Sequence, residues 1–127
     1  MERRFLLGLA ILILVLAFAI GAAIGMKAIH APGEEALAQA ARFALAGDME
    51  QAVPLARGAY ERWQKYRGTT SAFADHTPMD EIERLFREML VYAEEKEVSH
   101  FAACCTQLSA MLKATYETHS FSLKNIL

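Results

Sequence analysis

The residues best suited to chemistry lie between Phe73 and Phe86, in the run FADHTPMDEIERLF. Asp75 and His76 are adjacent there, and three more carboxylates follow within a few positions. Carboxylate oxygens and an imidazole nitrogen are common metal ligands, and the same pair of groups can transfer protons. A metal or ligand site at Asp75 and His76 is therefore one interpretation of this run.

The same run also has the composition of a helix start. Thr77 is a typical N-cap residue, Pro78 then falls at the first helical position, and Asp80 takes the reciprocal place of a capping box. Acidic residues are favoured at the positive end of a helix, so capping accounts for most of the cluster. Because His76 precedes this cap, it does not share a helical face with Asp80. Asp75 and His76 remain either a weak metal or partner site or ordinary loop residues.

Cys104 and Cys105 are the only cysteines of the chain. Adjacent cysteines form a strained ring and rarely bond to each other, and their spacing matches no zinc motif. Both fall on the apolar face of a predicted helix, where thiols behave as small hydrophobic groups. We expect buried thiols, with an intermolecular disulfide as the alternative.

Trp63, Tyr60 and Tyr66 recur at helical spacing and could form a ligand face or a partner surface. Helical spacing of aromatic residues is more typical of a core, so we expect Trp63 and Tyr60 to anchor one. The sequence contains no nucleophile–base pair in a supporting context, no glycine-rich phosphate loop and no nucleotide motif. It therefore indicates a protein that is not an enzyme and has no cofactor.

The stretch from Phe5 to Met26 contains no charged or strongly polar residue. As a helix it would be about 33 Å long, against roughly 30 Å for the hydrocarbon core of a bilayer. We interpret residues 5–26 as a transmembrane helix that follows a short segment, 1–4. The alternative is a cleaved signal peptide, since small residues at Ala23 and Gly25 resemble a cleavage site.

Gly21 and Gly25 form a G-x-x-x-G motif, which allows two membrane helices to approach closely and would support a homo-oligomer. The alternative is that these small residues face lipid. Arg3 and Arg4 precede the apolar stretch, whereas only Lys27 follows it closely. The positive-inside rule then predicts a single-pass protein of the cell membrane, with a cytoplasmic N-terminus and an extracytoplasmic C-terminal domain.

Pro32-Gly33 interrupts the helical pattern after the apolar stretch, so residues 27–33 are predicted to be a hinge, with a simple kink as the alternative. Residues 34–119 then contain four segments with the period of amphipathic helices, and no segment alternates with period two. Gly47 and Asp48 have the types of a helix C-cap and of the next N-cap. The sequence therefore predicts an all-α chain: a transmembrane helix, an antiparallel four-helix bundle made of two αα-hairpins, and a tail at 120–127.

The chain has 13 Lys and Arg residues against 15 Asp and Glu. It has no basic stripe, which argues against a nucleic-acid partner, and no polybasic patch follows the apolar stretch. The lipid bilayer and a protein partner are the expected partners.

Two resemblances add to this interpretation. The run AGDMEQA at 46–52 resembles the turn inside a tetratricopeptide-type helical hairpin, which implies an αα-hairpin. Trp63, Asp75-His76, MDEIERL and the ending SLKNIL, after an N-terminal apolar span, resemble a family of small single-pass membrane proteins of unknown function, found mainly in Gram-positive, often spore-forming, bacteria. That resemblance implies an envelope location and a helical ectodomain, but no activity.

The segment at 120–127 ends in Asn125, Ile126 and Leu127. Ile126 and Leu127 could pack on the bundle while Asn125 caps a helix, or the three could bind a partner. The leading hypothesis is a membrane-anchored accessory or scaffold module that holds a partner protein at the cell envelope. The alternatives are a ligand or metal sensor built on Asp75 and His76 and, with least support, a hydrolase without an identified nucleophile.

Overall fold

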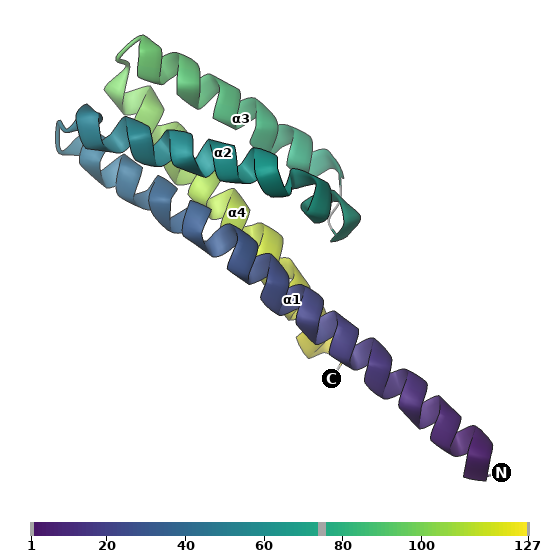
Figure 1. Ribbon diagram of the computed structural model, residues 1–127. Coiled ribbons are helices and arrows are strands. Elements are labelled where there is room, and N and C mark those ends of the chain that lie inside the picture. The colour runs from purple at the N-terminus through teal and green to yellow at the C-terminus, as the bar shows by residue number, and fades with distance from the viewer. Residues whose placement is uncertain (1, 74–75, 127) are drawn as a thin grey trace.

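The computed structural model describes the backbone of residues 2–73 and 76–126, and the side chains of residues 2–72 and 78–117. Four helices follow one another: α1 (Glu2–Leu45), α2 (Met49–Phe73), α3 (His76–Glu94) and α4 (Val98–Ile126). They pack as a bundle in which successive helices run antiparallel, and α1 projects far beyond it toward the N-terminus (Figure 1). No strand occurs in the two described ranges, and the predicted all-α bundle is confirmed.

The turn between α1 and α2 has the geometry that its sequence predicts. Gly47 has a φ of 86°, in the left-handed region where glycine has no steric cost. The amide of Asp48 donates to the carbonyl of Phe43 at 2.8 Å, and the Asp48 carboxylate accepts from the amide of Gln51 at 3.2 Å. This is a Schellman C-cap followed directly by an N-cap, which makes the first hairpin tight.

The turn between α3 and α4 repeats this geometry without a glycine. The amide of Glu97 donates to the carbonyl of Tyr92 at 3.0 Å, and the amide of Lys96 donates to Ala93 at 3.3 Å. Lys96 takes the left-handed position, with a φ of 58°. A residue with a Cβ is strained there, and the sequence alone offered no signal for this turn.

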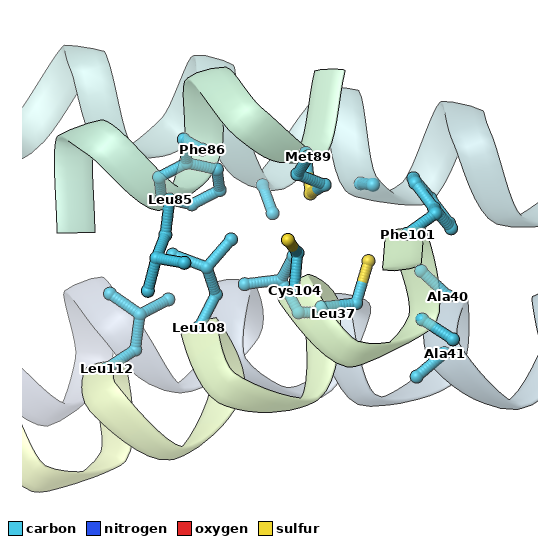
Figure 2. Packing of buried hydrophobic residues seen from close by; sticks show 14 of the residues in the cluster. Leu37, Ala40, Ala41, Leu85, Phe86, Met89, Phe101, Cys104, Leu108 and Leu112 are labelled. Carbon is cyan, nitrogen blue, oxygen red and sulfur yellow. The ribbon is translucent and has the colours of Figure 1, made fainter. Parts of the chain in front are cut away.

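The core lies between all four helices and is built from alternating small and large residues. Figure 2 shows Phe86 and Met89 of α3 directed toward Leu108 and Cys104 of α4. Small residues on the facing sides of α1 and α2 allow these two helices to approach closely: Ala40, Ala41 and Ala44 of α1 and Ala52, Ala56 and Ala59 of α2. Cys104 and Cys105 are buried and free, so the prediction of core thiols is confirmed.

The hinge predicted at residues 27–33 is wrong, because α1 continues through Pro32 as one helix. Proline has no amide hydrogen to donate to the carbonyl four residues earlier, which is that of Ala28. Arg62 of α2 supplies the missing donor: its Nη2 lies 3.2 Å from the Ala28 oxygen, and its Nε lies 2.7 Å from the Ile29 oxygen. A guanidinium from the neighbouring helix thus satisfies the carbonyls that the proline disturbs.

The two halves of α1 face different surroundings. Its apolar side chains up to Ile24 are largely exposed, as in Ile13, of which 58% is accessible. From Met26 onward one stripe of the helix is buried in the bundle: Met26, His30, Gly33, Leu37, Ala40, Ala41 and Ala44. α1 is long and apolar enough to cross a membrane by length and composition.

The boundary predicted between a bundle at 34–119 and a tail at 120–127 does not coincide with a helix end. α4 continues to Ile126 without interruption. It also pairs with α1 more extensively than with α3, and runs along α1 past the ends of α2 and α3 (Figure 1).

Candidate functional site

A cavity of about 250 Å³ opens between the second half of α2 and the first turns of α3. Its lining includes polar and charged side chains as well as two apolar ones: Trp63, Arg67, Gly68, Ser71, Met79, Asp80 and Glu83. The cavity lies at the end of the α2–α3 hairpin, the part of the chain in which the sequence placed its candidate acid–imidazole pair.

Trp63 and Glu83 form the inner wall of this cavity. Trp63 sits on the core-facing side of α2 with 2% of its surface exposed, and its ring stacks near Phe86 at a centroid distance of 6.2 Å. The indole Nε1 donates to Glu83 Oε2 at 2.7 Å. A buried indole N–H needs such an acceptor, so this bond fixes both the ring and the carboxylate.

Two guanidinium groups approach the same carboxylate. Arg67 Nη1 lies 3.3 Å and Arg87 Nη2 lies 3.7 Å from Glu83 Oε1. Arg87 follows Glu83 at i,i+4 spacing, which places the two side chains on one face of α3. With donors on both oxygens, Glu83 is suited to binding and orienting cations, and poorly suited to removing a proton from a substrate.

The predicted metal site at Asp75 and His76 stays a prediction. Asp75 lies outside the described residues, and only the backbone of His76 is described, as the first residue of α3. Asp80 is exposed and borders the cavity. Among the described side chains, those of residues 2–72 and 78–117, no three His, Cys, Asp or Glu are grouped as metal ligands.

The predicted helix cap is displaced by the start of α3. Thr77 was expected to precede the first turn, but α3 begins one residue earlier, at His76. The side chain of Thr77 lies outside the described ones, so its capping box with Asp80 remains untested.

A second polar cluster joins α1 to α2 inside the bundle, and sequence reasoning missed it. His30 and Thr70 are both buried, and His30 Nε2 lies 2.8 Å from Thr70 Oγ1. The Thr70 hydroxyl donates to the carbonyl of Tyr66 at 3.0 Å, so it accepts from the imidazole and His30 carries its proton on Nε2. The sequence signal for the burial of His30 was its spacing, because it falls in the series of buried α1 residues that recur every three or four positions.

Burial and a neighbouring cation keep His30 neutral. Removal from water, which is the larger cause, and the positive charge of Arg62 together lower the pKa of His30 to about 4. At neutral pH the imidazole is therefore an uncharged part of the helix interface. Its ring centre lies 5.9 Å from that of Trp63, which lines the cavity.

A third contact joins α4 to α1 close to Pro32. The Tyr116 hydroxyl donates to the Glu34 carboxylate, and Ser109 Oγ donates to the Glu34 carbonyl at 2.9 Å. The hydrogen bond to Glu34 is the main cause that raises the pKa of Tyr116 to about 12. Gly33 lies beside Leu112, whose Cδ1 would be 3.4 Å from a Cβ added there.

The remaining predicted interaction residues divide into three groups. Trp63 is a core residue, so its assignment as a surface for a partner protein is wrong, and the core alternative is confirmed. Among the described residues, no atom of another part of the chain lies within 4 Å of the position that a Cβ would take at Gly21 or Gly25, and a helix–helix contact there stays a prediction. Asn125 and Ile126 are described only as backbone of α4, and Leu127 lies outside the described residues.

Comparison with known proteins identifies a family. The model of the family described as "Domain of unknown function (DUF4363)" matches residues 28–126, which is most of the chain. This agrees with the resemblance to an uncharacterised family that the sequence carries. No curated protein and no solved structure matches the chain.

Proposed function

This chain belongs to the DUF4363 family, and we propose that it is a membrane-anchored helical accessory module that holds a partner protein at the cell envelope, without a catalytic role. The observation that carries the proposal is the continuity of α1. One helix supplies both a long, exposed apolar segment and a wall of the bundle core.

The exposed part of α1 supports the membrane anchor. Large apolar side chains of this segment are more than half exposed: Phe5, Leu6, Leu7, Ile11, Leu12, Ile13, Leu14, Val15, Phe18 and Ile24. Apolar surface in water costs about 25 cal/mol per Å², so an isolated helix of this kind requires a cover. Lipid chains provide one around the whole circumference of a helix, which a soluble partner rarely does.

The proposed anchor is rigidly coupled to the bundle. Arg62 bridges α2 to the carbonyls of Ala28 and Ile29, and His30 bonds to Thr70 immediately beyond them. These contacts hold α1 straight where Pro32 would otherwise weaken it. A rigid connection is useful for a scaffold, because it fixes the height and orientation of the bundle relative to the membrane.

The orientation follows from charge. Arg3 and Arg4 lie on one side of the apolar segment and Lys27 lies on the other. On the positive-inside rule the bundle lies outside the cytoplasm. Protease treatment of intact cells tests this part: digestion of an epitope tag placed after residue 127 supports it, and protection of the tag in intact but not in lysed cells contradicts it.

The partner is tested with the full-length chain in its own membranes. Cells are cross-linked, membranes are washed with carbonate and solubilised in mild detergent, and the tagged chain is purified. The control bait keeps residues 1–26 and carries an unrelated helical bundle. We expect one or a few proteins to be enriched with the natural bundle and absent from the control. Recovery of the chain alone, or release of the chain by carbonate, contradicts the proposal.

The cavity at the α2–α3 hairpin supports a second candidate, an extracytoplasmic ligand or metal sensor. Arg67, Asp80 and Glu83 give this cavity both signs of charge, and it lies beside Asp75 and His76 in the sequence. Calorimetric titration of the full chain in detergent with Zn²⁺, Mn²⁺ and Ca²⁺ tests the metal form, with an Asp75→Asn, His76→Gln double variant as control. Absence of heat and of a shift in melting temperature rejects this form.

A further inference from the structure

The contacts between α1 and α4 fix how far α4 reaches along α1. Leu112 of α4 lies against Gly33, and Ser109 bonds to Glu34. The two helices run antiparallel, so Ile126 lies as far beyond Leu112 as Ala19 lies before Gly33. The last two turns of α4, residues 119–126, therefore run beside residues 19–26 of α1, which are part of its apolar segment (Figure 1).

The burial of α1 agrees with this register. Leu16, Ala19, Ala22 and Ala23 are half-buried, whereas the intervening Ile20 is more exposed. Their spacing extends the buried stripe of the bundle toward the N-terminus. α2 cannot cover this part of α1, because Thr70 bonds to His30 and α2 ends one turn later, at Phe73. α4 is the helix that accompanies α1 along this segment.

Charged and aromatic side chains lie at one common level along the axis of α1, just beyond the apolar segment. Lys27 ends that segment on α1, and Arg62 of α2 bonds to the carbonyl of Ala28. Arg62 and Lys65 both lie over the ring of Tyr66, each 5.2 Å from its centre. Cations with an aromatic ring are typical of the boundary between hydrocarbon and headgroups.

The acidic residues of α4 stop at the same level along the axis of α1. Glu117 is exposed and lies 3.8 Å from Lys113. By the register of Leu112 with Gly33, Glu117 is level with Ala28, just outside the apolar segment. No acidic residue follows Glu117, and the residues that continue α4 are THSFSLKNI, in which Lys124 is the one lysine or arginine. The long apolar stem of a lysine lets its ammonium reach the headgroups from inside a leaflet. The last acidic residue of α4 thus lies level with the boundary that Lys27 marks on α1.

We propose that residues 119–126 of α4 are a second membrane-inserted element, which enters one leaflet beside α1 on the side of the bundle. The inference rests on the proposed membrane anchor. Eight residues rise only about 12 Å, so this element cannot cross the bilayer and ends within the leaflet that it enters. A helix satisfies most of its own backbone groups, which makes such an entry possible. The bundle therefore lies directly on the membrane surface, without a stalk that separates it from the lipid.

The test is a cysteine scan of residues 119–126 in the full chain, reconstituted in phosphatidylcholine–phosphatidylglycerol vesicles. Each variant is labelled with an environment-sensitive fluorophore and quenched by nitroxide lipids or by aqueous iodide. Consecutive positions sample every face of the helix. Ile13→Cys is the reference for lipid and Ala103→Cys, exposed on α4 inside the bundle region, is the reference for water. The unlabelled background is the parent chain, whose two cysteines are buried.

We expect the outward-facing positions of the scan to resemble Ile13→Cys, with blue-shifted emission, strong quenching by nitroxide lipids and weak quenching by iodide. If no position from 119 to 126 is quenched by nitroxide lipids while Ile13→Cys is, the inference is overturned and the anchor stands. If Ile13→Cys also escapes nitroxide quenching, the proposed anchor fails and the inference fails with it.

Discussion

Arg62 provides the sharpest test of how α1 tolerates a proline. Replacing it with methionine keeps an unbranched apolar stem but leaves the Ala28 carbonyl without a donor and removes the bond to Ile29. Hydrogen bonds from charged donors contribute about 1.5–3 kcal/mol each, and a buried unsatisfied carbonyl costs about 1–3 kcal/mol. The Ile29 bond is partly buried and the Ala28 bond is exposed, so we expect Arg62→Met to lower the free energy of unfolding by about 2 kcal/mol in total.

The proline makes this prediction specific, because Pro32→Ala restores an amide hydrogen for the carbonyl of Ala28. Arg62→Met should then cost less in the Pro32→Ala background than in the parent, and the two changes should couple by at least about 0.5 kcal/mol. Arg57→Met, at an exposed position of the same helix, is the matched control.

The assay is denaturant unfolding of the full chain in mild detergent, followed by helical circular dichroism and by the fluorescence of Trp63, the single tryptophan. Equal costs of Arg62→Met with and without Pro32 would refute the reasoning, because the guanidinium would then serve a purpose unrelated to the proline. A cost no larger than that of Arg57→Met would refute it as well.

Three further changes are predicted. Lys96→Gly should raise the free energy of unfolding by about 1 kcal/mol, because it relieves the left-handed strain at a φ of 58°; a loss of stability in a denaturant melt would contradict this. The pKa of His30 is lower in the folded chain than in the unfolded chain. The contribution of neutral His30 to the free energy of unfolding is therefore fully present above about pH 6.5 and is lost as the pH falls toward 4. The melting temperature should decrease between pH 7 and pH 5 in the parent, but much less in His30→Gln, and equal slopes would argue against a role for the imidazole. Trp63→Phe should lower the free energy of unfolding by about 1–3 kcal/mol in a denaturant melt, because it leaves Glu83 without its indole donor. Glu83→Gln should then destabilise the Trp63→Phe variant less than it destabilises the parent.

Some features of the candidate site could be predicted from the sequence because they depend on neighbours within one helix. The Glu83–Arg87 pair follows from i,i+4 spacing, and the burial of Trp63 follows from its place in an apolar stripe. The bond between Trp63 and Glu83 and the approach of Arg67 join two helices. Their relative rotation is set by packing, so no local pattern reveals that these side chains surround one cavity.

The sequence by itself determined the helical class, the apolar segment, the turn at Gly47 and Asp48, and the burial of the two cysteines. Each depends on periodicity, composition or dihedral preference within a turn or two of the chain. Only the tertiary structure decided that α1 passes through Pro32, because the donor that replaces its missing amide comes from Arg62 on α2. Tertiary structure likewise set the height at which α4 ends beside α1, since that height depends on the register of Leu112 against Gly33 and not on where an amphipathic pattern weakens.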